Sequence, residues 1–144
     1  MTIKSFRGQM INGTIDAISL HTNTGSTGYR ITKLEVIGID PRGSGMEGVV
    51  KIFSIPQTAV TDKIDFSDNT LLACAFYENN SSQSYFGGTS IIFDNMTFNQ
   101  DVYVTAATDD SINYYIEMEQ ISLDLSENTV ATLKDIRNIT QPDV

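Results

Sequence analysis

The feature that most constrains the fold is a regular alternation of apolar and polar side chains in INYYIEME, residues 112–119. Ile112, Tyr114, Ile116 and Met118 fall on one side of this run, and polar residues such as Asn113 and both glutamates fall on the other. Side chains of a β-strand point alternately to opposite faces, so this period of two predicts a strand with one buried and one solvated face. The chain is therefore expected to form packed β-sheets.

Seven further segments have strand composition and are bounded by clusters of Gly, Pro, Asn, Asp or Ser. They are Ile3–Met10, Thr14–Leu20, Tyr29–Ile39, Val49–Ile55, Leu71–Tyr77, Thr89–Phe93 and Asp101–Ala106. Eight short strands with hardly any helical periodicity between them predict an all-β fold, an antiparallel β-sandwich that is jelly-roll-like. An immunoglobulin-like sandwich is the alternative, against which only the missing Cys and Trp hallmark counts.

The end of the chain departs from this pattern in two places. After Gln120 the apolar positions shift by one residue, which predicts a bulge or bend near Gln120. From Ser126 to Ile139 the apolar residues recur at three-to-four spacing, which predicts either a short C-terminal helix or an extended arm on a neighbouring subunit. We expect a β-sandwich domain over residues 1–125 and a C-terminal helix or arm over residues 126–144 that is part of the same domain.

The charge and composition of the chain limit the classes of partner that it can bind. Eighteen acidic residues against nine Lys and Arg give a formal net charge of −9, and the basic residues are scattered. Nucleic acid and anionic membranes are bound through clustered cations, so no nucleic-acid and no membrane partner is expected. A chain of 144 residues with 40% hydrophobic residues can bury a single core without disulfides.

Redox and targeting signals are weak. Cys74 is the only cysteine and lies in an apolar run, which predicts a buried and inert thiol. The N-terminal segment lacks a long apolar region, and no apolar run approaches the roughly 18 residues of a membrane span. These features predict a protein that is kept in a cytosol or assembled there into a larger structure.

Polar residues in the stretch IIFDNMTFNQDVYVT raise the question of a metal site. Asp94, Asn95, Asn99 and Asp101 have the oxygen ligands that calcium accepts. Their spacing matches no EF-hand, and Asx side chains also bond to the local backbone in turns between strands. We therefore predict a structural turn, with calcium as the alternative.

The alternation of apolar and polar residues gives two further predictions about local structure. Phe93 and Phe98 are expected to hold this turn against the core, with Val102 and Val104 on one face of the strand that follows. In TDKIDFSDN, residues 61–69, the alternation of apolar and acidic residues predicts a short strand with solvated acids.

No group of residues amounts to a catalytic site. His21 is the only histidine and no Gly-x-Ser-x-Gly motif is present, so His21 is expected to contact solvent or a neighbouring subunit. Glu117 and Glu119 share a strand face at a separation of about 7 Å, near that of paired glycosidase carboxylates. A strand with one apolar face predicts instead a solvated or subunit-facing acidic surface. We expect no catalytic, cofactor-binding or metal-binding residues.

An aromatic loop is predicted at Tyr85 and Phe86, which are followed by Gly87 and Gly88. This loop is expected either to contact a sugar or a partner chain, or to fold back over the core.

Five segments together cover nearly the whole chain. They are HTNTGSTGYRITKLEVIG (21–38), EGVVKIFSIPQTAV (47–60), IDFSDNTLLACAFYE (64–78), IIFDNMTFNQDVYVT (91–105) and NYYIEMEQISLDLSENTVATLKDIRNI (113–139). In this order and spacing they resemble a family of small virion proteins of tailed bacteriophages, particularly phages of marine bacteria and cyanobacteria. The resemblance implies a structural protein of the particle with a β-sandwich fold and no known enzymatic activity. It supplies no catalytic or cofactor residues.

The leading hypothesis is therefore a non-enzymatic decoration or cement protein of the phage head. Its partners would be the major capsid protein or other virion proteins, and it would act in the virion as a homo-oligomer, with a trimer favoured. A tail or fibre-associated adaptor is one alternative. A carbohydrate-binding module for a host surface glycan is another, in which rings are supplied by Tyr85, Phe86, Tyr103 and Tyr114. An enzyme is the least favoured.

Overall fold

The computed structural model describes residues 2–22, 24–43, 45–80, 85–93 and 96–123. This part of the chain forms eight β-strands and contains no helix that could span a membrane. The strands are β1 (Thr2–Met10), β2 (Thr14–Ile18), β3 (Thr27–Gly38), β4 (Met46–Phe53), β5 (Leu71–Asn80), β6 (Tyr85–Ile92), β7 (Val102–Thr108) and β8 (Ile112–Ser122). Each of the eight predicted strands is present, with ends that differ by a few residues.

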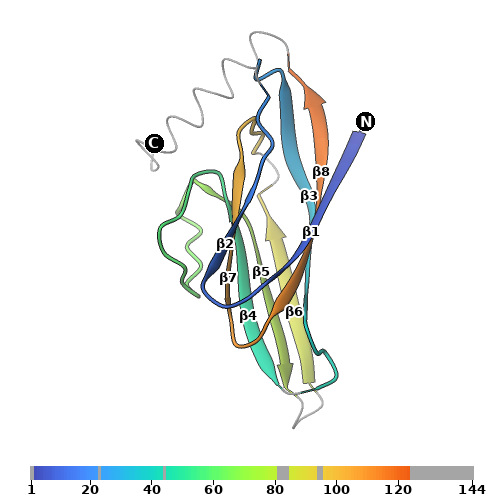
Figure 1. The fold of residues 1–144 in the computed structure, drawn as a ribbon, viewed down its shortest axis with the longest axis vertical. Helices are drawn as coiled ribbons and strands as arrows, with labels where there is room; N and C mark the ends of the chain where they lie inside the picture. Colours follow the sequence, from blue (N-terminus) through green and yellow to red (C-terminus); the bar gives the residue numbers. More distant parts are fainter. Residues whose placement is uncertain (1, 23, 44, 81–84, 94–95, 124–144) are drawn as a thin grey trace.

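Two antiparallel sheets pack face to face, which confirms the predicted β-sandwich (Figure 1). The smaller sheet has the order β1-β8-β3, and the larger has the order β2-β7-β4-β5-β6. The last strand, β8, lies between β1 and β3, and its register with β1 is unbroken from Thr2 opposite Gln120 to Met10 opposite Ile112. The first and last strands of the described chain are therefore direct partners.

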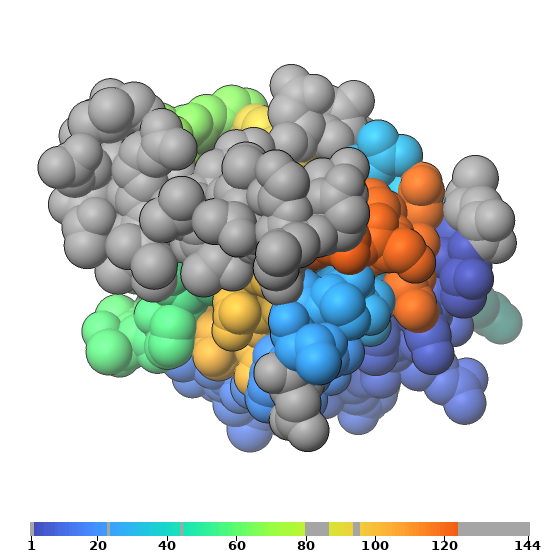
Figure 2. Space-filling view, turned by 90° about the horizontal axis from the view of Figure 1, so that it is seen from above, coloured from blue at the N-terminus to red at the C-terminus, as the bar shows by residue number. Residues whose placement is uncertain are grey.

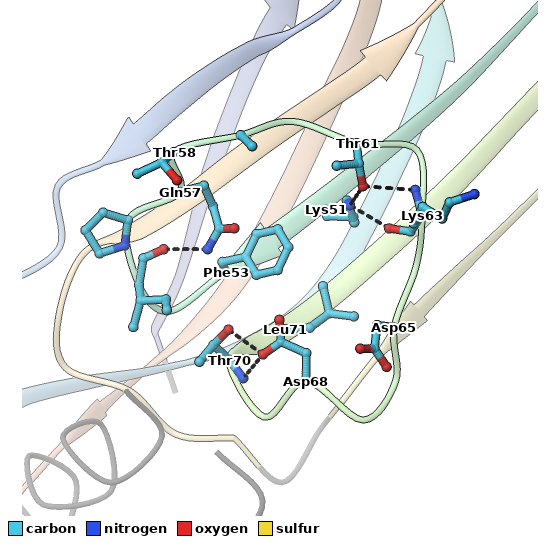
Figure 3. A pocket seen from close by; sticks show the side chains of 13 residues that line it. Lys51, Phe53, Gln57, Thr58, Thr61, Lys63, Asp65, Asp68, Thr70 and Leu71 are labelled. Atoms are coloured by element: carbon cyan, nitrogen blue, oxygen red, sulfur yellow. Dashed lines mark hydrogen bonds between the residues drawn. The ribbon is translucent and has the colours of Figure 1, made fainter. Parts of the chain in front are cut away.

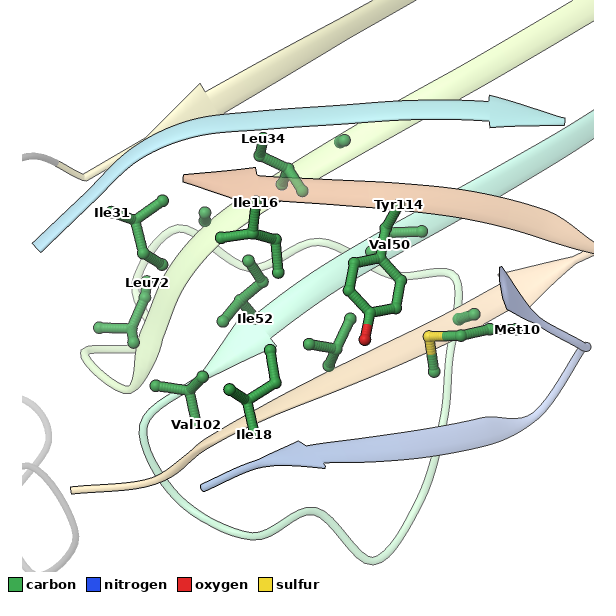
Figure 4. Close-up of a cluster of buried hydrophobic side chains, with 14 of the residues drawn as sticks. Met10, Ile18, Ile31, Leu34, Val50, Ile52, Leu72, Val102, Tyr114 and Ile116 are labelled. Carbon is green, nitrogen blue, oxygen red and sulfur yellow. The ribbon is translucent and has the colours of Figure 1, made fainter. Parts of the chain in front are cut away.

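The core lies between the sheets and follows from the alternation on their central strands (Figure 4). The apolar residues of β8 that define the alternation are 0% to 6% exposed. The fully buried core residues of the larger sheet include Val50, Ile52, Val102, Val104 and Ala106. The predicted shared face of Val102 and Val104 is thus confirmed. Each fully buried Ile, Val or Met contributes about 1.5–3 kcal/mol through removal of apolar surface from water.

The strand order matches most of a jelly roll. In an eight-stranded jelly roll the sheets have the orders 1-8-3-6 and 2-7-4-5. The orders β1-β8-β3 and β2-β7-β4-β5 are present here, but β6 pairs with β5 instead of completing the smaller sheet. A complete jelly roll is therefore not confirmed. An immunoglobulin-type order, which places the first strand beside the second, is not observed either.

The bulge predicted near Gln120 is wrong. β8 stays in register with β1 through Gln120, and the irregularity lies in β3, between Ile31 and Lys33. The buried positions of β3 change phase there, because Thr32 is an extra exposed residue whose Oγ1 donates a hydrogen bond to the Glu117 carbonyl oxygen at 3.2 Å.

Two further predictions concern segments outside the central strands. The predicted aromatic loop is wrong, because Tyr85 to Gly88 form the first half of β6 and pair with residues 77–80 of β5. The predicted C-terminal helix or arm, and the division at residue 125, lie outside the described residues.

Tyr114 links the two sheets. Its hydroxyl, on β8, donates a hydrogen bond to Asp16 Oδ2 on β2 at 3.3 Å. Burial, reinforced by the nearby Asp16 carboxylate, raises the pKa of Tyr114 to about 12. The ring lies against Gly8 on β1, where a Cβ atom would be 2.8 Å from the ring. Gly8 thus makes room for the ring that joins the sheets.

The substitution Gly8→Ala is expected to lower the free energy of unfolding by about 1–3 kcal/mol, because the added Cβ displaces the buried Tyr114 ring. Urea unfolding followed by circular dichroism measures this change. Thr2→Ala, at an exposed position of the same strand, is the control and is expected to stay within about 0.5 kcal/mol of the unmodified protein. Equal stability of the two variants would contradict the packing role of Gly8.

Candidate functional site

A long loop between β4 and β5 folds over the outer face of the larger sheet and encloses a pocket (Figure 3). The loop comprises residues 54–70, and the pocket has a volume of about 450 Å³. Loops of this length are uncommon in compact domains unless they have structure or function of their own. In Figure 2 this loop, in green, lies on the opposite side of the molecule from the beginning of β1, in dark blue.

The floor of the pocket comes from β4. Core-facing Val50 and Ile52 alternate with Lys51 and Phe53, whose side chains point to the outer face. Lys51 is 6% exposed and Phe53 is 7% exposed, although they lie outside the sandwich core. Both are buried because the loop covers them, so β4 is buried on both faces.

Lys51 attaches the loop to the sheet. Its Nζ donates a hydrogen bond to the Lys63 carbonyl oxygen at 2.6 Å and a longer one to Thr61 Oγ1 at 3.4 Å. The ammonium also lies 5.6 Å from the centre of the Phe53 ring. Burial lowers the pKa of Lys51, and the negative charge of nearby Asp62 opposes this shift. A buried cation is costly unless it is hydrogen-bonded, and the loop backbone supplies that bond.

Two aspartates organise the second half of the loop. Asp65 Oδ1 accepts hydrogen bonds from the Ser67 hydroxyl at 2.6 Å and the Ser67 amide at 2.9 Å, and these bonds hold the pKa of Asp65 below its usual range. Asp68 Oδ1 accepts the same pair of bonds from Thr70. The strand predicted over residues 61–69 is therefore wrong, because Asx turns replace it.

The pocket has the groups needed to bind a small polar molecule. The bonds to Ser67 and Thr70 use only Oδ1 of each aspartate, so Oδ2 is available within the described structure. These carboxylates and the Gln57 amide lie around an apolar floor that includes Phe53. Pockets of about 300–1,000 Å³ with an apolar lining and a few polar groups are typical of ligand sites. No group of three His, Cys, Asp or Glu residues suitable for a metal occurs among the described residues.

Of the four candidate calcium ligands, Asn99 and Asp101 lie in the part of the chain that the structure describes. Asp94 and Asn95 lie outside it, and Asn99 is 1% exposed. Asp101 Oδ1 lies 2.7 Å from His21 Nδ1 and accepts hydrogen bonds from the amides of Leu20 and His21 at 2.8 Å and 3.1 Å. Burial raises the pKa of Asp101, but these hydrogen bonds outweigh it and hold the pKa below its usual range.

The remaining predicted residues have structural partners. The His21 side chain is 55% exposed, which agrees with a loop histidine, but its contact with Asp101 was not predicted. Glu119 accepts a hydrogen bond from Arg30 at 2.8 Å, and Glu117 accepts one from the Tyr115 hydroxyl at 2.7 Å. Cys74 is 4% exposed, and burial raises the pKa of its thiol, so the predicted buried cysteine is confirmed.

Lys51 is the residue that the sequence analysis missed, although a signal for it was present. It interrupts the apolar run VVKIF in a strand with hydrophobic residues on both faces. A lysine in such a run must find a hydrogen-bond partner outside the strand, and the long loop that follows is the nearest source.

No family model, curated protein or solved structure matches this chain.

The substitution Lys51→Met is expected to release the loop and leave the sheets folded, because replacement of a buried charge by an apolar side chain often costs little stability. Limited trypsin digestion is the measurement. Cleavage after Lys63 should become about tenfold faster, which corresponds to about 1.4 kcal/mol easier local opening. Cleavage after Arg42, in the β3–β4 connection, is the internal control and should not change. An unchanged rate after Lys63 would contradict the role of Lys51 as the attachment.

Proposed function

We propose that this chain is a non-enzymatic structural protein of a tailed-phage particle that decorates the outer shell of the head. The proposal is supported by the outer face of the β1-β8-β3 sheet, which no other described part of the chain covers. A decoration protein needs such a face to bind a shell. The five-segment resemblance to phage virion proteins supports the same role.

Apolar side chains are exposed on this face in a way that suits protein binding. Ile37 is 53% exposed and Tyr115 is 36% exposed, and both line a depression of about 430 Å³ together with Arg7. Aromatic, aliphatic and arginine side chains around a depression are typical of the central part of protein interfaces.

The charge of the chain is distributed unevenly between this sheet and the rest. Among the described residues, the smaller sheet has the cations Lys4, Arg7, Arg30 and Lys33 and the anions Glu35, Glu117 and Glu119. The rest of the described chain has three cations, Arg42, Lys51 and Lys63, against ten aspartates and glutamates. Long-range repulsion from an acidic partner is therefore weakest at the smaller sheet.

The substitutions Ile37→Asp and Tyr115→Asp are each expected to reduce the number of copies bound per purified particle at least about tenfold, a loss of about 1.4 kcal/mol per site. Quantitative mass spectrometry referenced to the major capsid protein measures the copy number. Ile64→Asp is the matched control, because Ile64 is 40% exposed but lies on the loop over the other sheet. Equal incorporation of all three variants would rule out this face as the binding surface.

The copy number of the unmodified protein per particle distinguishes a location on the head from a location on the tail. Hundreds of copies per particle are expected for a head decoration protein. A handful of copies would contradict the proposal and favour a tail or fibre-associated adaptor.

Saccharide binding is a second candidate, favoured by the loop pocket. Tyr114, one of the rings named from the sequence, is buried in the core and is not exposed to a sugar. Instead, Asp65, Asp68 and Gln57 offer hydrogen-bond acceptors around an apolar floor. Lys51 and Lys63 also line the pocket, so its formal charges balance, and a neutral ring with hydroxyl groups suits it because the hydroxyls can donate to both carboxylates.

Titration with glucose and N-acetylglucosamine, followed by backbone amide NMR, tests this candidate. Saturable shifts are expected in residues 54–70, and Asp65→Asn should weaken them about tenfold while its Oδ1 still accepts from Ser67. Asp40→Asn, an exposed aspartate between β3 and β4, is the control. The absence of shifts in the loop would rule out these sugars.

A further inference from the structure

Four strands form the edges of the two sheets, namely β1 and β3 in the smaller sheet and β2 and β6 in the larger. Edge strands expose unpaired backbone groups, and proteins protect them with charges, bulges or short length. β1 has Lys4 and Arg7, and β3 has Lys33 next to its bulge. β2 is protected by its length of five residues. Three of the four edges are thus protected against pairing with another chain.

β6 has none of these protections. Its eight residues, YFGGTSII, include no charge and no proline, and they pair with β5 in unbroken register. Gly88, Thr89, Ser90 and Ile91 are exposed to solvent. Gly88 has its reason within the fold, because a Cβ there would lie 2.9 Å from the Phe76 carbonyl oxygen on β5.

The hydrogen bonds of β6 show which of its backbone N–H and C=O groups point toward β5 and which point away. The Phe93 amide donates to the Leu72 carbonyl oxygen on the β5 side at 3.0 Å. Hydrogen bonding alternates between the two sides of an antiparallel strand, so Phe86, Gly88, Ser90 and Ile92 direct their N–H and C=O groups away from β5. No described strand pairs with these groups.

We infer that β6 pairs antiparallel with β6 of a second copy of this chain, about a two-fold axis at Thr89. In this register Gly88 lies opposite the partner's Ser90, and Phe86 lies opposite the partner's Ile92. Every outward-directed backbone group of β6 is then paired. The two Thr89 side chains meet at a non-hydrogen-bonded position, where threonine pairs are favourable.

The charge distribution favours a second copy of this chain as the binding partner at the β6 edge. The chain has a net charge of −9, so self-association through most of its surface brings acidic residues together. β6 itself has no charged residue, and Glu35 of β3 is the only charged residue that lines the pocket beside Gly88, Thr89 and Ser90, so repulsion between two copies is weaker here than at the acidic parts of the surface. In a two-fold contact the β6 edges of both copies pair with each other, so neither edge remains free to bind a third copy. A head-to-tail contact would leave a free edge and allow a filament to grow. This pairing produces a dimer, in contrast to the trimer that the sequence analysis favoured.

Sedimentation equilibrium of the full chain at about 100 µM tests the pairing, since this concentration populates a dimer with a Kd of about 10 µM or tighter. The expected mass is twice the chain mass of 15.9 kDa. Thr89→Lys places two cations face to face on the axis and should raise the Kd at least about tenfold. Thr2→Lys, an exposed threonine on β1, is the matched control and should remain dimeric.

Ser90→Pro is a second, backbone-directed variant. The Ser90 N–H points away from β5, so proline removes a bond to the partner and none to β5, and the dimer should dissociate while the fold is kept. In the unmodified dimer the Gly88 and Ser90 amides should exchange slowly with solvent, and Gly88 should exchange fast in Thr89→Lys. A monomeric unmodified chain overturns the inference, and so does a dimer or trimer that persists in both variants.

Discussion

The packing of β8 against the larger sheet is the interaction on which the rest of the structure depends. Its residues Ile112, Ile116 and Met118 are fully buried between β1 and β3 on either side and β4 and β7 across the core. Because the register with β1 is unbroken over nine residue pairs, the positions of β1 side chains are fixed by β8. Gly8 beside Tyr114 is one result of this constraint, since a larger residue has no space there.

The two outer faces of the sandwich differ because their sequences differ. On the smaller sheet the outward residues of β8 are polar or amphipathic and need no cover. On the larger sheet the outward residues include Val49, Phe53, Leu71 and Cys74, which are all buried. A sheet that is apolar on both faces needs a third layer, and residues 54–70 provide it. Lys51 attaches residues 54–70 to the sheet through its hydrogen bonds. The pocket therefore forms because this loop covers the apolar outer face of the larger sheet.

Local patterns in the sequence predicted the elements, but not the contacts between distant residues. Period-two alternation located all eight strands because side-chain direction depends only on neighbouring residues. The pairing of His21 with Asp101 joins residues 80 positions apart, and no local pattern reports it. The pairing of β6 with β5, which departs from the jelly-roll order, is another contact between strands that no local pattern reports. The Asx turns of the loop were different, because Asp-x-Ser and Asp-x-Thr are local signals that the alternation of apolar residues obscured.

The proposed dimer and the proposed shell-binding face are geometrically compatible. The two-fold axis of an antiparallel strand pair is perpendicular to the sheet, so both copies present the same side of a continuous ten-stranded sheet. Their smaller sheets then lie on one side, and both outer faces point in the same direction. Such a dimer would bind a shell through two faces at once, and the second contact would gain from the high effective concentration set by the first. A single face of modest size, with few exposed apolar residues, could then suffice for stable decoration.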